Sequence, residues 1–197
     1  MALYTKPATL LTVTVERLGP NCPFANERFS FEANPAQVVW LRGPSGVGKS
    51  FTCMHLAGLA ELPGVSLGAD WDPVVPERER IGFLFQKGVL IDALTLRENI
   101  ALALRSAGTE ALTEERIATS LIAVGLSSER DGHKMPGELS GGMLRRAALA
   151  QVLAQRKRLI VLDEPFVGLD PPVALDIADL LARYEMGKPA FYFELPP

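Results

Sequence analysis

Apolar and polar residues alternate in two stretches near the start of the chain. In Thr9–Val15, leucine and valine alternate with threonine, and Arg28–Ala33 repeats the pattern with two phenylalanines. Successive side chains of a strand point to opposite faces of a sheet. The period of two therefore predicts two antiparallel strands that are covered on one side only.

Short continuous apolar runs predict strands of another kind, buried on both faces of a parallel sheet. Four such runs occur: Val38–Leu41, Ile81–Phe85, Leu159–Leu162 and Ala190–Phe193. Helical spacing and capping residues predict helices between them, at Lys49–Ala60, at Leu96–Arg105, at Thr113–Val124 with Thr113 as the N-cap, and from about Met143.

Strands that alternate with helices favour an α/β fold. We expect one domain over residues 1–197, in which 1–86 and 151–197 form a core lobe and 87–150 an inserted helical subdomain. The first two strands would form a separate antiparallel β subdomain beside a mixed core sheet.

Composition narrows the class of protein. The net charge of -3 gives no support for nucleic acid as the main partner, and 48% hydrophobic residues are ample for a core. Cys22 and Cys53 match no disulfide or metal spacing, which favours reduced thiols in a cytosolic protein. No apolar run approaches the roughly 20 residues of a membrane span, and the N-terminus does not match a signal peptide. A role at a membrane would therefore require another chain to hold this one there.

A glycine-rich segment follows the run Val38–Leu41. The residues of GPSGVGKS fit G-x-x-x-x-G-K-[ST] and lie between a predicted strand and a predicted helix, the context in which backbone N–H groups cradle phosphates. Lys49 would bridge the β- and γ-phosphates, and the Ser50 hydroxyl would bind Mg²⁺. A glycine-rich connection that merely contains a lysine is the weaker alternative. The predicted nucleotide-binding residues here are Gly43, Pro44, Ser45, Gly46, Val47, Gly48, Lys49, Ser50 and Phe51.

The run Leu159–Leu162 ends in two carboxylates. Asp163 would hold Mg²⁺ through its water shell, and Glu164 would polarise the water that attacks the γ-phosphate. A buried strand that ends in solvated acids is the alternative, and the phosphate loop makes it the weaker one. Gln86 follows Ile81–Phe85, where a neutral amide would contact the metal or the attacking water. From position alone, a polar residue leaving a strand explains Gln86 as well.

The stretch LSGGM contains a serine and two glycines before a helix rich in alanine and arginine. Ser140 would cap this helix, but a cap alone does not explain both Gly141 and Gly142. Their N–H groups at a helix start form a second anion site. Because one ATP cannot occupy both sites, we predict a two-fold dimer in which each phosphate loop faces the partner's LSGGM.

Together these residues resemble the nucleotide-binding domain of ABC transporters over nearly the whole chain. The motifs are the phosphate loop, Gln86, LSGGM, LIVLDE and the D-loop Gly168–Asp170. The resemblance implies a P-loop NTPase fold, ATP and Mg²⁺ as cofactors, ATP hydrolysis by Glu164 with Gln86, and a nucleotide contact by Asp170. It also implies a homodimer or heterodimer that sandwiches ATP. That dimer would dock on a separate transmembrane permease at the inner face of the cell membrane.

A finer resemblance is to the ATPases of Mla/Mce-type lipid transporters, in which methionine replaces the last glutamine of LSGGQ and a double arginine follows. It is carried by Phe85–Arg105, Met135–Ala150 and Asp163–Pro171. The resemblance implies ATP-driven movement of phospholipid or another hydrophobic substrate. The coupling helix of the permease would dock near residues 86–105.

Three positions depart from the family pattern. Leu195 stands where the family has a switch histidine, and we expect neither His55 nor His133 to replace it. Leu18–Gly19 occupies the place of the adenine-stacking aromatic, for which Phe24 is a weak substitute. Phe51 stands where a threonine commonly contacts the α-phosphate.

These departures predict slow but nonzero hydrolysis, because loss of one positioned group typically costs about 10²–10³ in rate. A second hypothesis treats the chain as a degenerate regulatory subunit that binds ATP with little hydrolysis. A third, a non-transport ABC protein acting on DNA or ribosomes, is disfavoured by the pI near 5.5 and the single copy of each motif.

Overall fold

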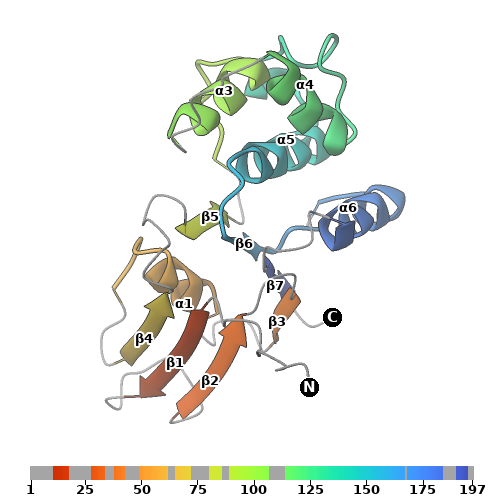
Figure 1. The fold of residues 1–197 in the computed structure, drawn as a ribbon. Coiled ribbons are helices and arrows are strands. Elements are labelled where there is room, and N and C mark those ends of the chain that lie inside the picture. Colours follow the sequence, from red (N-terminus) through yellow and green to blue (C-terminus); the bar gives the residue numbers. More distant parts are fainter. Residues whose placement is uncertain are drawn as a thin grey trace, which may run out of the picture.

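The computed structural model describes residues 11–17, 28–33, 38–42, 49–61, 65–71, 80–85, 89–106, 114–166, 168–183 and 190–194. Its strands form two sheets with a helical lobe above them (Figure 1). The strands are β1 (Leu11–Arg17), β2 (Arg28–Ala33), β3 (Val38–Arg42), β4 (Val65–Trp71), β5 (Ile81–Leu84), β6 (Leu159–Asp163) and β7 (Ala190–Glu194). The helices are α1 (Lys49–Leu56), α3 (Leu96–Ser106), α4 (Glu114–Ala123), the 3₁₀ helix η1 (Pro136–Glu138), α5 (Gly141–Ala154) and α6 (Pro171–Arg183).

The first sheet is the expected antiparallel β subdomain. Its order is β2-β1-β4, and β1 lies antiparallel to both neighbours, with Val13 opposite Phe31 on one side and Ala69 on the other. The third strand, β4, is not among the predicted elements. Its sequence VSLGADW carries the period of two, with apolar residues at positions 65, 67, 69 and 71, but the glycine in its interior is unfavourable in a strand.

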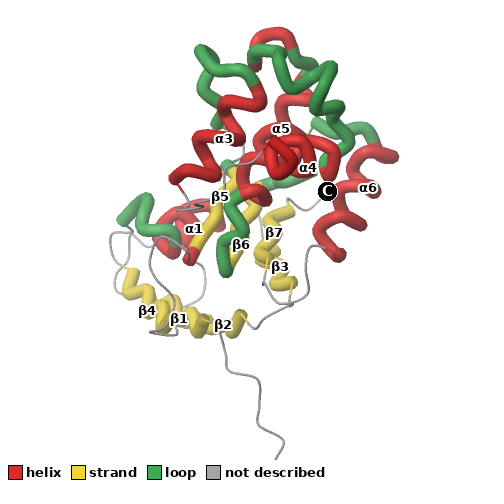
Figure 2. Tube along the Cα trace, turned by 45° about the horizontal axis from the view of Figure 1, so that its top comes forward, coloured by secondary structure: helices red, strands yellow, loops and turns green. Residues whose placement is uncertain are grey.

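The second sheet is parallel throughout, in the order β3-β7-β6-β5 (Figure 2). All four strands are those predicted from continuous apolar runs, and every residue of β6 is buried. The antiparallel pairings lie in the separate β subdomain, as expected, and among the described strands the core sheet is parallel where we expected a mixed one. Because parallel strands run in the same direction, their carboxyl ends lie along one edge of this sheet.

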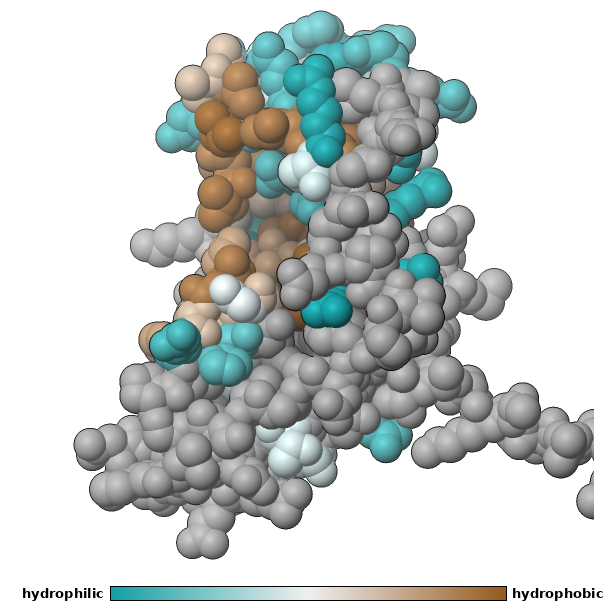
Figure 3. Space-filling model, turned by 60° about the vertical axis from the view of Figure 1, so that its left-hand side comes forward, coloured by the Kyte–Doolittle hydropathy of each residue, from teal (hydrophilic) through white to brown (hydrophobic). Residues whose placement is uncertain are grey.

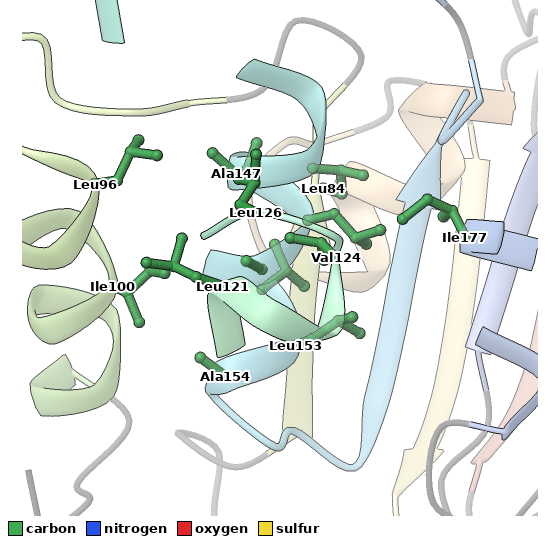
Figure 4. Close-up of a cluster of buried hydrophobic side chains, with 14 of the residues drawn as sticks. Leu84, Leu96, Ile100, Leu121, Val124, Leu126, Ala147, Leu153, Ala154 and Ile177 are labelled. Atoms are coloured by element: carbon green, nitrogen blue, oxygen red, sulfur yellow. The ribbon is translucent and has the colours of Figure 1, made fainter. Parts of the chain in front are cut away.

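The helical lobe and the parallel sheet share one hydrophobic core. Figure 4 shows Leu84 of β5 and Ile177 of α6 in the same cluster as Ile100 of α3 and Leu121 of α4. Helix α5 lies between the lobe and the sheet, in contact with α3, α4 and β5. Its buried face is rich in alanine, and small side chains allow neighbouring elements to approach it from several sides.

Two predicted helix boundaries are wrong for reasons of capping. The helix expected to reach Ala60 ends at Leu56, because Gly58 adopts a left-handed φ of 70° and the amide of Leu59 bonds back to Met54. The helix expected from about Met143 begins at Gly141, because the hydroxyl of Ser140 accepts a hydrogen bond from the Met143 amide. This helix continues to Ala154, so the predicted lobe boundary after residue 150 falls inside it.

Helix α6 is also absent from the predicted elements, although its sequence carries a signal. Proline stands at its first position, and Ile177 and Leu181 are buried one turn apart. The predicted N-cap Thr113 lies outside the described residues.

Two further expectations concern cysteine and the membrane. Cys53 is a free thiol buried in α1, and burial raises its pKa, with Asp163 acting in the same direction; Cys22 lies outside the described residues. Within the ranges that the structure describes, no helix combines the length and the apolar character that a bilayer crossing requires.

Candidate functional site

The candidate site lies along the carboxyl edge of the parallel sheet. Strand β3 runs toward the phosphate-loop segment, and α1 begins at Lys49 directly after that segment. Strand β6 ends at Asp163, opposite Phe193 of β7, and Asp163 contacts Ser50 in the first turn of α1. The order of the strands therefore brings together motifs that are more than a hundred residues apart in sequence.

One hydrogen bond in this site joins Ser50 and Asp163, two of the three predicted metal ligands. The Ser50 hydroxyl donates a hydrogen bond of 3.1 Å to a carboxylate oxygen of Asp163. Burial raises the pKa of Asp163, and the neighbouring Glu164 raises it further. The hydrogen bond from Ser50 and the charges of Arg145 and Lys49 act in the opposite direction. On balance the pKa of Asp163 is raised, because burial outweighs the hydrogen bond and the nearby positive charges.

These two side chains fit a magnesium ion. Mg²⁺ prefers hard oxygen ligands and usually keeps several waters, so it binds through one or two protein groups plus substrate phosphates. A hydroxyl and a carboxylate within hydrogen-bonding distance supply that set. No group of three or more His, Cys, Asp or Glu suited to a metal occurs among the described residues.

Glu164 has an unusual backbone conformation. Its φ is 50°, in the left-handed region that residues other than glycine rarely adopt, and the residue is 9% exposed. Strained conformations of this kind persist only where surrounding contacts hold them, and they cluster at functional sites. The strain and the burial favour a specific role for this carboxylate over that of a solvated acid at a strand end.

Arg145 of α5 is a residue of this site that sequence reasoning missed. It is 7% exposed, and its guanidinium donates to the backbone carbonyls of Phe85, Asp163 and Glu164, each at 2.5 Å. Burial lowers the pKa of Arg145, and the charges of Asp163 and Glu164 oppose that shift. The sequence shows two adjacent arginines in an apolar helix, with no signal for which one is buried.

The LSGGM turn lies at the start of α5. Ser140 caps the helix, as one interpretation of the sequence expects. Among the described residues, a Cβ atom placed on Gly141 would meet nothing within 4 Å, and one placed on Gly142 would meet the Gly168 carbonyl at 3.7 Å and Leu169 at 3.9 Å. The surrounding described residues therefore leave room for a side chain at both positions, so their packing does not explain the two glycines.

The D-loop lies beside this turn. Gly168 has a left-handed φ of 77°, which favours glycine, and its carbonyl faces Gly142. Asp170 is exposed and precedes α6, where its carbonyl accepts from the Ala174 amide. Two predicted nucleotide-contacting segments thus meet in one chain.

Several predicted residues lie outside the described part of the chain. They are the phosphate-loop residues Gly43, Pro44, Ser45, Gly46, Val47 and Gly48, the amide Gln86, the positions Leu18, Gly19 and Phe24 discussed for adenine stacking, and Leu195 in place of the switch histidine. Of the remaining candidates, Phe51 is 52% exposed on α1. His133 is exposed and His55 is half-buried.

Comparison with known proteins gives a consistent result. A family model described as ABC transporter matches residues 26–167. A sulfate/thiosulfate import ATP-binding protein, CysA of Nocardia farcinica, is 35% identical over 88% of this chain and 53% of its own length. A thiamine import ATP-binding protein, ThiQ of Cereibacter sphaeroides, is 41% identical over 72% of this chain and 62% of its own.

A third relative is the lipoprotein-releasing system ATP-binding protein LolD of Hyphomonas neptunium. It is 38% identical over 70% of this chain and 64% of its own length. The chain therefore spans between half and two thirds of the length of these three curated relatives.

The fold is also that of a solved structure, a dimeric post-hydrolysis state of the ATP-binding cassette MJ0796 bound to ADP and Pi. The TM-score is 0.76, with 26% identity over 92% of this chain and 87% of that one. This match confirms the α/β P-loop NTPase fold expected from the sequence.

Proposed function

This chain belongs to the ABC transporter family, and on that premise we propose that it binds ATP with Mg²⁺ and hydrolyses it to drive transport through a separate permease. The observation that carries the proposal is the contact between Ser50 and Asp163, with the strained Glu164 directly after it. A hydroxyl, a metal-binding carboxylate and a general base at one sheet edge are the protein groups that phosphoryl transfer to water requires.

Each residue has a distinct role in the proposed reaction. Mg²⁺, when bound, would neutralise charge on the β- and γ-phosphates. Ser50 and Asp163 hold the ion, and Lys49 contributes positive charge at the same phosphates. Glu164 accepts a hydrogen bond from water and orients it toward the γ-phosphate. Gln86 would contact the metal or that water.

The proposed active form is a dimer. The described residues leave room for a side chain at Gly141 and Gly142, which supports an approach by something outside the chain, and the two amides at the start of α5 suit a phosphate. In this arrangement each LSGGM turn, together with Asp170, completes the nucleotide site of the partner. The dimer in the solved MJ0796 structure supports the same assembly. Both a homodimer and a heterodimer satisfy this geometry.

Phosphate release is the direct test. Purified protein with ATP should release phosphate in the presence of Mg²⁺, and this release should stop when EDTA removes the ion. The reason is that Ser50 and Asp163 carry no positive charge and cannot neutralise the phosphates by themselves. We expect a rate about 10²–10³ below that of a relative that has the switch histidine. The measurement is steady-state phosphate release against ATP concentration. A rate that equals the relative's would show that the missing histidine is unimportant, and a rate insensitive to EDTA would contradict the metal site.

We further propose that the transported substrate is phospholipid or another hydrophobic molecule, and that the chain is held at the inner face of the membrane by its permease. The support is the resemblance of Phe85–Arg105 and Met135–Ala150 to Mla/Mce-type ATPases. The relatives are named for sulfate, thiamine and lipoprotein systems and leave the substrate open. Three exposed apolar residues, Val89, Ile91 and Leu102, belong to the proposed docking region. Figure 3 shows hydrophobic side chains gathered on one face of the helical lobe.

A tagged copy of this chain expressed in its source cells should recover the permease, and the complex in vesicles should move labelled phospholipid when ATP is added. Val89→Asp should reduce the recovered permease by at least about tenfold, because it places a charge in an apolar contact. Ile122→Asp on α4 is the matched control, since Ile122 is 63% exposed and Val89 60%. Movement of thiamine or sulfate instead of phospholipid would contradict the substrate, and equal recovery with both variants would contradict the docking region.

A further inference from the structure

Arg145 connects three parts of the site through one side chain. It lies on α5, one turn after the start of the helix at Gly141. Its guanidinium donates to the carbonyl of Phe85 at the end of β5, and to the carbonyls of Asp163 and Glu164 at the end of β6. A further hydrogen bond of 3.4 Å reaches the carbonyl of Pro165. The planar fork of arginine suits this task, because its five N–H donors have fixed directions.

The residues that Arg145 contacts are neighbours of the proposed chemistry. Phe85 directly precedes Gln86, and the carbonyl of Glu164 belongs to the residue whose φ is 50°. Two of the contacts fix the peptide groups on either side of the Glu164 Cα, so they restrain the direction in which its carboxylate leaves the backbone. A strained conformation needs such restraint from the surrounding structure.

The adjacent arginine provides a contrast within the same helix. Arg146 also donates to backbone carbonyls, of Gly125 at 2.9 Å and of Val124 at 3.4 Å, but both lie in the helical lobe. Arg145 and Arg146 thus have the same chemistry and the same kind of acceptor. They differ in where the acceptor carbonyls lie: those of Arg145 are at the carboxyl edge of the parallel sheet, and those of Arg146 are not.

We propose that Arg145 is a positioning residue for hydrolysis: it holds the backbone of Glu164 in its strained conformation and connects the LSGGM helix to the segment that carries Gln86. This inference rests on the proposed ATPase function.

The test compares Arg145→Lys and Arg145→Gln with Arg146→Lys. Lysine keeps the charge but has no rigid fork with which to reach carbonyls in two segments. We expect both Arg145 variants to lower kcat on the order of tenfold to a hundredfold, because small displacements of a catalytic group have effects of that size. The KM for ATP should stay within about threefold, since the phosphate cradle is untouched. Arg146→Lys should keep kcat within about twofold of the unaltered protein.

Melting temperatures and phosphate release are measured on all four proteins. A fall in kcat that is confined to the Arg145 variants, with KM retained, supports the positioning role. Unchanged kcat in the Arg145 variants overturns it, and so does a parallel fall in all three variants that follows their melting temperatures. If the Arg145 variants do not fold while Arg146→Lys does, the role of Arg145 is structural, and the proposed positioning role is overturned as well. Absence of hydrolysis by the unaltered protein is a separate outcome, which removes the proposed function and this inference together.

Discussion

Glu164→Gln is expected to lower the rate of phosphate release on the order of 10³-fold while leaving ATP binding intact. The amide has nearly the same shape as the carboxylate but cannot act as the base that polarises water, and general-base catalysis contributes about 10²–10⁴ in rate. Ser50, Asp163 and Lys49 remain, so the nucleotide is still held. Because bound ATP is no longer consumed, the dimer should accumulate. Phosphate release and gel filtration with and without ATP measure the two effects.

The matched control for this variant is Glu129→Gln, which neutralises an exposed acid of the helical lobe away from the sheet edge. This variant should retain the full rate of phosphate release and the same ATP-dependent equilibrium between monomer and dimer as the unaltered protein. The same experiment separates the two hypotheses for this chain. A degenerate regulatory subunit would show no difference in phosphate release between the two glutamine variants. That result would contradict the hypothesis that the chain is an ATPase.

Gly141→Ala is expected to abolish the ATP-dependent dimer and to lower phosphate release about a hundredfold without loss of stability. The added methyl group would meet nothing within 4 Å in the described residues, so these give no reason for destabilisation. Alanine in place of glycine in a helix stabilises by roughly 0.5–1 kcal/mol, and by less at its first position. A large functional loss must then arise from contact with a partner's nucleotide. Gel filtration with ATP, phosphate release and a melting temperature measure the three quantities.

Gly137→Ala serves as the control, because a Cβ atom there would also meet nothing within 4 Å in the part of the chain that the structure describes, and η1 is not part of the LSGGM turn. It should leave the dimer and the rate unchanged. Full activity of Gly141→Ala would show that the turn is only a capped helix start, the interpretation in which Ser140 alone matters. The proposed dimer geometry would then be wrong.

Local patterns predicted most of the fold. All four strands of the parallel sheet follow from apolar runs, because burial on both faces leaves no polar positions. Two described elements outside that prediction, β4 and α6, also carry local signals: β4 has apolar residues at alternate positions, and α6 has apolar residues at helical spacing. Helix ends were displaced where a cap decided them, at Gly58 and at Ser140.

The candidate site also has a part that the sequence predicts and a part that depends on the tertiary fold. Ser50 and Asp163 belong to motifs whose spacing is local, and each could be assigned from its own few residues. Their contact across 113 positions agrees with the assignment, but it depends on the strand order that places β6 near β3. Nothing in the periodicity of the sequence specifies the order β3-β7-β6-β5.

The sequence by itself determined the local chemistry of this protein: a phosphate-binding loop, a strand that ends in two acids, and a serine–glycine turn before a helix. These depend on residue types at short spacing, which a linear pattern records. Only the tertiary structure decided which of two adjacent arginines is buried, and that the buried one holds Phe85 and Glu164, which lie 60 and 19 positions away from it. The physical reason is that a hydrogen bond requires proximity, and proximity between distant segments is set by strand order and helix packing.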